Sequence, residues 1–204
     1  GYAQWQYKAG EKITFNTGLH YLQLALNNSS AIEPRASVKW DITNKQSLSF
    51  GYGLHSQVQA LGVYFAQAKD ANNINYSPNK NLDFTQSQHY VLSHNFLLGK
   101  NLRLKTELYY QQLSNVPVSN SDTNTFSTVN IIEAFVTDPL TNKGEGKNYG
   151  LEISLEKYLS NNFYYMFSNS FYQSKYTAAD GIERNTRFNG GYVSNLVAGK
   201  EFIS

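Results

Sequence analysis

The segment Ser47–Gln59 alternates between two kinds of side chain with almost no exception, and this pattern constrains the fold more than any other feature. Side chains of a strand point to opposite faces with a period of two, so one face is apolar and aromatic and the other is small and polar. A strand of this length is about twice the usual length in a globular protein. Such a strand suits a barrel wall between lipid and a water-filled lumen. The even positions are Leu48, Phe50, Tyr52, Leu54, Ser56 and Val58, and the odd positions are Ser49, Gly51, Gly53, His55, Gln57 and Gln59.

The composition narrows the class of protein. Of the 204 residues, 15% are aromatic and 16% are charged, whereas roughly 25% charged residues are usual in soluble domains. The net charge of +2 gives no argument for nucleic acid as a partner. No run approaches the roughly 18 apolar residues of a transmembrane helix, which excludes a helical membrane protein but leaves a β-barrel open. Cysteine is absent, so disulfide and thiol chemistry are excluded.

The same alternation recurs along the chain, and the apolar positions do not follow helical spacing. One segment starts with Ile13 in one phase and ends with Leu22 in the other, which predicts a bulge near Tyr21. His94 falls among apolar positions, which predicts a bulge there or a place near the membrane interface. We predict about nine strands with boundaries uncertain by about 2–4 residues, at 2–8, 12–26, 33–42, 47–59, 87–98, 101–113, 147–158, 162–176 and 187–203.

The connections alternate strictly between short and long. The short ones, at 9–12, 43–46, 99–101 and 160–162, contain the Gly and Asn residues that tight hairpin turns require. Outer-membrane barrels have short periplasmic turns at one rim and long extracellular loops at the other. This parity therefore predicts that 60–86 and 114–146 lie outside the cell. The long connections are 27–32, 60–86, 114–146 and 177–186.

Aromatic residues gather beside the short turns and predict a girdle at the membrane interface. A soluble β core also uses aromatic residues, but it gives no reason for clustering beside the turns. The residues expected in the girdle are Tyr2, Trp5, Tyr7, Trp40, Tyr158, Phe163, Tyr164 and Tyr165.

No motif indicates catalysis or a resident metal. The histidines, His20, His55, His89 and His94, form no recognised ligand pair. Glu152 and Glu156 lie on one face of a strand at roughly 13 Å, too far apart for a glycosidase pair. We interpret them as lumen charges facing water. In the last loop, Glu183 and Arg184 near Arg187 predict a local ion pair.

Several segments together resemble the barrel of TonB-dependent outer-membrane receptors of the Bacteroidetes type, over nearly the whole chain. These segments are 31–40, 47–57, 79–83, 101–111, 115–118, 148–157, 180–185, 188–190 and 198–202. The resemblance implies an all-β fold: an antiparallel up-and-down transmembrane β-barrel segment, about nine strands of a larger barrel of about 22. Residues 1–204 are expected to form a partial barrel domain, with the plug domain and the final strands absent.

The resemblance also implies the function: energy-dependent uptake of a scarce or bulky nutrient through the bacterial outer membrane, not catalysis. The implied partners are outer-membrane lipid, the TonB complex through the absent plug domain, an unknown nutrient ligand and a surface lipoprotein; no nucleic acid, cofactor or metal is expected. The glycines at 51 and 53 would allow close approach of the plug. The candidate lumen-lining residues are His55, Gln57, Arg103 and Glu152.

Two alternatives remain open from the sequence. One is a passive porin-like or structural outer-membrane barrel without energy coupling. The other is a soluble β-sandwich binding module. A soluble sandwich needs a second sheet over its apolar face, so the environment of Leu48, Phe50 and Tyr52 discriminates between lipid and protein as the covering.

Overall fold

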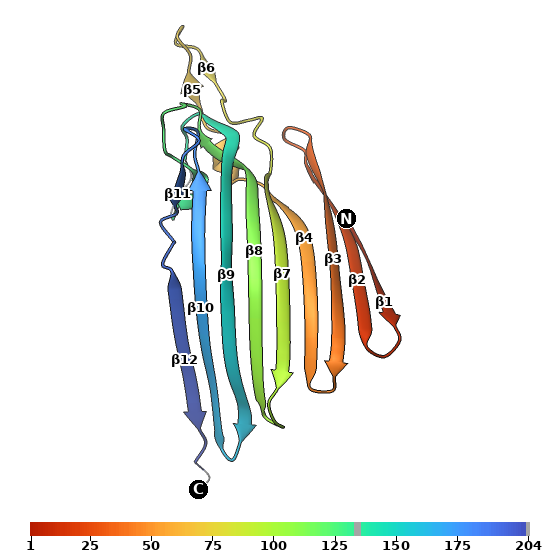
Figure 1. Ribbon diagram of the computed structural model, residues 1–204. Helices are drawn as coiled ribbons and strands as arrows, with labels where there is room; N and C mark the ends of the chain where they lie inside the picture. The colour runs from red at the N-terminus through yellow and green to blue at the C-terminus, as the bar shows by residue number, and fades with distance from the viewer. Residues whose placement is uncertain (133–135, 203–204) are drawn as a thin grey trace.

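The computed structural model describes residues 1–132 and 136–202, and its main element is one antiparallel sheet (Figure 1). Each long strand pairs with its neighbour in the chain, and β1 and β12 lie at the two edges, so the wall is not closed. The strands are β1 (Tyr2–Ala9), β2 (Ile13–Leu24), β3 (Ser29–Thr43), β4 (Gln46–Gln57), β7 (Thr85–Leu97), β8 (Leu102–Ser119), β9 (Leu140–Ser160) and β10 (Phe163–Thr177), with β11 (Glu183–Asn185) and β12 (Tyr192–Lys200) both paired to β10.

All nine predicted strands are confirmed, within the described residues, as β1 to β4, β7 to β10 and β12. The last prediction, 187–203, is too long, because β12 covers only 192–200 and residue 203 lies outside the described part. β11 lies inside the predicted loop 177–186. The up-and-down antiparallel architecture expected from the alternation is therefore observed.

β8 and β9 extend well beyond the predicted 101–113 and 147–158. The alternating sequence pattern ends there, where Asn115 and Pro117 favour a turn. In the structure Asn115 has a positive φ of 55°, and the register between β8 and β9 shifts between Leu113 and Val118. Pairing continues because Val116 and Val118 are fully buried. Gly144 permits this close contact, since a Cβ there would lie 2.8 Å from the Val116 carbonyl oxygen.

The turns form as predicted at one end of the sheet. Asn161 and Asn162 both have positive φ, 54° and 60°, as a two-residue primed turn requires. At the other end, the predicted loop 27–32 is wrong: β3 already begins at Ser29, and Leu24 pairs with Ser29. Asn28, with φ 60°, lets the chain turn tightly here. The length of the connections therefore does not alternate strictly, although all the long loops lie at one end of the sheet and all the connections at the other end are short (Figure 1).

The predicted bulge near Tyr21 is wrong, because β2 and β3 pair without a register shift from Ile13 to Leu24. The phase changes for another reason: Leu24 packs against the hydrophobic cluster under the long loops. At His94 the ladders that β7 forms with β4 and with β8 are also continuous, so there is no bulge. His94 lies near the short turn that follows β7.

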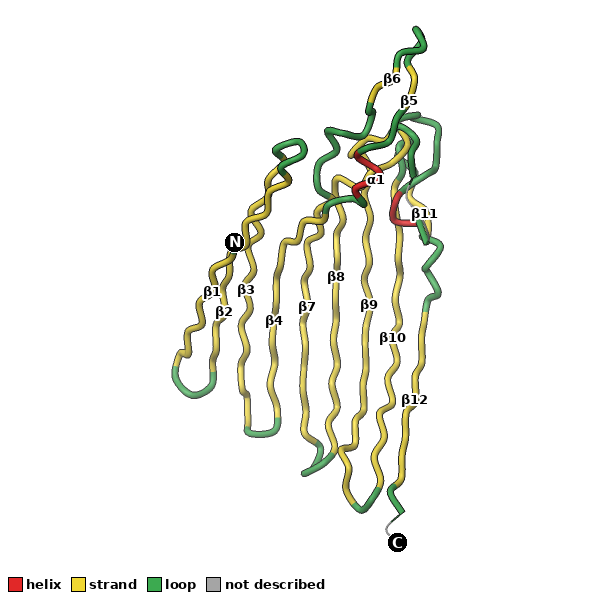
Figure 2. Tube along the Cα trace, turned by 180° about the vertical axis from the view of Figure 1, so that it is seen from behind, coloured by secondary structure: helices red, strands yellow, loops and turns green. Residues whose placement is uncertain are grey.

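The buried core lies under the long loops rather than along the sheet. Val63, Tyr64, Leu82 and Leu140 form one cluster there, with Tyr64 only 1% exposed. The loops carry the remaining elements of the described chain, all at this end (Figure 2). These are α1 (Leu61–Tyr64), the hairpin of β5 (Ala68–Lys69) and β6 (Asn75–Tyr76), and the 3-10 helix η1 (Thr128–Asn130).

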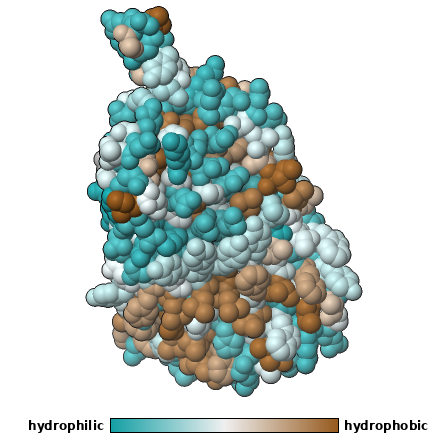
Figure 3. Space-filling view, turned by 45° about the horizontal axis from the view of Figure 1, so that its top comes forward, coloured by the Kyte–Doolittle hydropathy of each residue, from teal (hydrophilic) through white to brown (hydrophobic). Residues whose placement is uncertain are grey.

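The rest of the sheet has two unlike faces. We call the surface that carries Asn16, Ser37, Gly51, His89 and Gln111 the polar face. The opposite, apolar face has no second sheet over it in the described chain. Its large side chains are exposed, and Figure 3 shows an apolar zone toward the short turns and a hydrophilic zone over the loops. These exposed side chains include Trp5, Phe15, Trp40, Phe50, Leu92, Leu108, Ile153, Phe167 and Phe171.

Candidate functional site on the polar face

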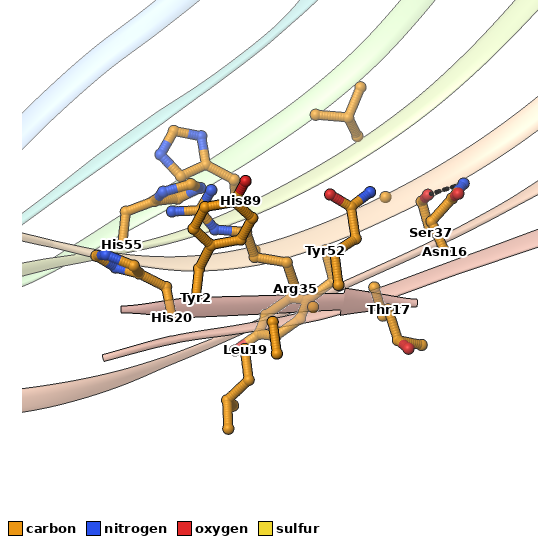
Figure 4. Close-up of a pocket in the computed structure, with 17 residues that line it drawn as sticks. Tyr2, Asn16, Thr17, Leu19, His20, Arg35, Ser37, Tyr52, His55 and His89 are labelled. Carbon is orange, nitrogen blue, oxygen red and sulfur yellow. Dashed lines mark hydrogen bonds between the residues drawn. The ribbon is translucent and has the colours of Figure 1, made fainter. Parts of the chain in front are cut away.

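A groove of ≈ 650 Å³ runs across the polar face of β1 to β4 and β7. Small residues make it hollow, notably Gly18 and Gly51, and its lining combines polar side chains with apolar residues such as Val91. Figure 4 shows the rings of His20, His55 and His89 gathered at one end of this groove. At the other end Asn16 donates a hydrogen bond of 3.2 Å to the Ser37 hydroxyl.

His55, a predicted lumen-lining residue, lies in this groove together with His89. Their rings meet edge to face with centroids 5.1 Å apart. Gly53 makes the contact possible, since a Cβ there would lie 2.9 Å from His55 Nε2. The sequence suggested that the space over Gly53 is open for close approach of a plug domain. In the structure His55 fills that space. Gly51 has open space above it, because a Cβ there would meet no heavy atom closer than 4.0 Å.

Glu33, which the sequence analysis did not single out, organises the groove wall. Its carboxylate is 3% exposed. It accepts hydrogen bonds from the Ser56 backbone N–H at 2.6 Å and from Arg35 Nη2 at 3.2 Å, and His20 Nδ1 lies 2.8 Å away. These contacts supply the partners that a buried carboxylate needs. The only indication in the sequence is that Glu33 lies on the same strand face as Arg35 and Ser37. This pattern is too common to identify a residue that binds several partners.

A chain of neutral polar side chains continues the wall across β7, β8 and β9. Ser87 Oγ lies 2.8 Å from His89 Nε2, and Gln111 donates to Ser87 Oγ at 2.8 Å. Asn148 in turn donates to Gln111 Oε1 at 2.8 Å. Amide and hydroxyl contacts on the polar face therefore connect His89 on β7 to Asn148 on β9 and give a continuous hydrophilic surface.

Gln57, the second predicted lumen residue, lines a separate space of ≈ 490 Å³ that we call the upper groove. The upper groove lies between the ends of β4 and β7 to β10, the segment that follows β11, and the loop that contains η1. Its lining includes Gln59, Asn148, Thr186 and Phe188. The structure therefore places Gln57 beside the long loops.

Arg103 and Glu152, the other two predicted residues, lie on the polar face nearer the short turns. Arg103 forms an ion pair of 2.8 Å with Glu156, so Glu156 is not part of a carboxylate pair. Glu152 stands opposite Glu107 across the ladder, and Glu107 is paired with Lys105. The structure thus does not bring the four predicted residues together. They lie at different levels of one face.

The apolar face carries an aromatic row that the sequence analysis missed. Tyr52, Tyr90, Tyr110 and Tyr149 are direct cross-strand partners on four adjacent strands. Neighbouring rings lie with centroids 5.1 to 6.4 Å apart. The four tyrosines share no local sequence pattern, so only the strand register could reveal them. Tyr side chains are typical of the interface between lipid and water.

The aromatic residues predicted beside the short turns are largely exposed, as a girdle requires. Trp5 stacks on Tyr7 with centroids 5.5 Å apart, and Phe163 lies 5.9 Å from Tyr165. Three of these aromatic residues lie on the polar face rather than the apolar one: Tyr2, Tyr158 and Tyr164. Tyr2 pairs with His20 in the ladder and lines the groove. Tyr158 is in phase with Glu156 and its ring lies 6.0 Å from Arg103, and Tyr164 is in phase with Met166, the ladder partner of Glu156.

The predicted ion pair between Glu183 and Arg184 is wrong, because neighbours on β11 point to opposite faces. Arg184 Nη2 instead contacts Asp180 Oδ2 at 2.6 Å, and this hydrogen bond lowers the pKa of Asp180. Glu183 pairs with Lys147, which lowers the pKa of Glu183, and its other oxygen lies 3.3 Å from Lys175 Nζ.

In the described ranges 1–132 and 136–202, no group of three or more His, Asp or Glu side chains is arranged to hold a metal ion. Nor does any helix in those ranges have the length and hydropathy to span a membrane.

Comparison with known proteins identifies the family and the fold of the chain. A family profile described as "TonB dependent receptor-like, beta-barrel" matches residues 1–198. No curated protein matches the sequence. The solved structure of the ferric-catecholate import receptor Fiu from E. coli K12 matches with a TM-score of 0.69 and 13% identity, covering 97% of this chain and 31% of that one.

Two further solved structures give the same result. The alcaligin outer-membrane receptor FauA from Bordetella pertussis matches with a TM-score of 0.65 and 14% identity, over 100% of this chain and 34% of that chain. The siderophore receptor PiuA from Acinetobacter baumannii matches with a TM-score of 0.64 and 16% identity, over 94% and 29%. The chain thus spans about a third of each of these receptors.

The family match and the geometry agree on an outer-membrane β-barrel. The narrower Bacteroidetes type stays a prediction. The chain belongs to the TonB-dependent receptor-like β-barrel family.

Proposed function

We propose that residues 1–204 form part of the barrel domain of a receptor that takes up a scarce or bulky nutrient through TonB coupling. The observation that carries the proposal is the division of one sheet into an uncovered apolar face and a hydrogen-bonded polar face. That division suits lipid on one side and an aqueous path on the other. The remaining strands and a plug domain would complete the barrel.

In this proposal the polar face lines the nutrient path. His55 and Gln57 lie toward the long loops, where a ligand would enter, and Arg103 and Glu152 lie farther along. The TonB complex would act through the plug domain, and outer-membrane lipid would contact the apolar face. A surface lipoprotein would be a further partner at the long loops.

The test is nutrient uptake by the full-length receptor in cells with and without TonB. Growth on limiting nutrients would identify a condition that depends on the receptor. We expect that growth to be lost when TonB is deleted and restored when it is supplied again. Receptor-dependent growth that persists without TonB would favour the alternative of a passive porin and contradict energy coupling.

A further inference from the structure

The apolar face contains one row of polar side chains between apolar rows. The row follows the ladder from β7 to β12, and only Ile153 of β9 interrupts it. We call its polar members, His94, Thr106, Asn169 and Ser194, the mid-sheet row. The rows on either side of it are apolar across β7 to β10. They consist of Leu92, Leu108, Leu151 and Phe171 toward the loops, and of Phe96, Leu104, Leu155 and Phe167 toward the short turns.

Depth in the membrane distinguishes Asn169 within the mid-sheet row. Strands of outer-membrane barrels tilt by about 35–45°, so a row of ladder partners is inclined to the membrane plane and its members lie at different depths. His94 lies near a short turn, whereas Asn169 lies midway along the apolar side of β10, between Phe163 and Lys175. A strand crosses the bilayer in about 9–11 residues. Asn169 therefore lies in the middle of the crossing.

Lipid alone does not suit the side chain of Asn169. An amide has two donor hydrogens and an acceptor oxygen, and Asn169 makes no side-chain hydrogen bond within residues 1–132 and 136–202. Hydrocarbon offers no partner, so an unpaired amide there loses the hydrogen bonds that it makes with water. Phe167 and Phe171, 40% and 52% exposed, flank Asn169 on the same face. A polar group at this depth, between large apolar side chains, indicates a contact with protein.

The chemistry of the amide points to a second copy as the partner. Two copies insert in the same orientation and to the same depth, so a two-fold axis along the membrane normal brings a residue of the contact face against itself. An amide both donates and accepts, so Asn169 can form two hydrogen bonds with Asn169 of the partner subunit. We infer that the apolar side of β10 around Asn169 is the contact between two copies of this receptor in the outer membrane. Lipid covers the rest of the apolar face.

The test uses the full-length receptor in native outer membranes with a single cysteine introduced by Asn169→Cys. Residues 1–204 contain no cysteine, and any cysteine elsewhere in the receptor is replaced. We expect mild oxidation to give a covalent adduct of twice the receptor mass. Phe50→Cys, on the apolar face of β4, is the control and should give no dimer. No adduct at position 169, an adduct of another mass, or equal dimer yields at the two positions would overturn the inference.

A leucine variant separates a second copy from lipid as the covering of Asn169. Asn169→Leu removes the self-pairing amide, and we expect about tenfold weaker dimerisation in mild detergent, measured by native mass spectrometry at stepped receptor concentrations. Ser168→Leu is the matched control, because Ser168 lies on the polar face of β10, paired with Ser154, and should leave dimerisation unchanged. An unchanged dimer in Asn169→Leu, or an unsubstituted receptor that is monomeric, would contradict the contact.

The outcome is separable from that of the proposed function. TonB-dependent uptake by a receptor that forms no dimer through Asn169 would overturn the inference and leave the proposed function standing. Dimers through Asn169 in a receptor whose uptake is independent of TonB would do the reverse.

Discussion

The loop end and the sheet of this molecule are stabilised by different means. At the loop end, Tyr64, Val116 and Val118 are buried to the degree seen in soluble proteins. Along the sheet, Phe50 and Leu108 are 44% and 51% exposed although both are large and apolar. The loop end thus supplies its own hydrophobic core, whereas residues 1–132 and 136–202 provide no covering for the apolar face of the sheet. Lipid is the covering that fits an outer-membrane receptor.

The largest expected effect is in the loop core. Tyr64→Ala should cost about 3–5 kcal/mol, because it removes a large buried side chain and leaves a cavity. Phe50→Ala should cost less, since fluid lipid can fill the space of the lost ring. Equilibrium unfolding of the full-length receptor in lipid bilayers measures both. Equal losses would remove the distinction between the two regions.

Charges placed on the two faces sharpen the comparison. Ile153→Lys should cost about 2–4 kcal/mol if Ile153 faces the middle of the bilayer. Ser154→Lys, one residue along on the opposite face, should cost about 0–1 kcal/mol because water can reach it. The same unfolding experiment gives both values, and a larger cost for Ser154→Lys would reverse the assignment of the faces.

A single amide links two long loops. Asn79 is fully buried; its Oδ1 accepts from the Leu140 N–H at 2.8 Å, and its Nδ2 donates to the Asp138 carbonyl at 2.9 Å. Asn79→Ala should cost about 1–3 kcal/mol, because it leaves buried backbone groups unpaired. Hydrogen exchange should accelerate around 138–142. The exposed Asn75 of β6 is the control, and Asn75→Ala should leave exchange there unchanged.

The smallest effect concerns the exposed loop before β11. The pKa of Asp180 is lowered by its hydrogen bond to Arg184, so the contact stabilises the loop above the unfolded pKa and is lost as the pH falls through the folded one. This window lies below about pH 4. Carboxyl NMR of Asp180 should show its pKa rising in Arg184→Ala. An unchanged pKa would show that Arg184 is not the cause.

The two regions also differ in how far the sequence predicts them. On the sheet, the period of two places Phe50 and Gly51 on opposite faces, and these faces are observed. At the loop end, burial of Val116 and Val118 keeps β8 paired beyond Asn115 and Pro117, against the local signals. Local periodicity contains no information about such long-range packing, so the strands there were predicted too short.

The candidate site shows the same limit. His55 could be assigned to the polar face from its phase alone, and the structure places it there. The central role of Glu33 depends on three partners from β2, β3 and β4. No spacing within one strand reveals such a convergence, and the tyrosine row across four strands was missed for the same reason.

The central claim is that the apolar face of this sheet contacts lipid and the polar face contacts water. Its most direct test is quenching by brominated lipid of a fluorophore attached to single cysteines at 48 to 52 in the full-length receptor, one position at a time. We predict strong quenching at Leu48, Phe50 and Tyr52 and weak quenching at Ser49 and Gly51. Uniform quenching, or quenching strongest at Ser49 and Gly51, would contradict the claim.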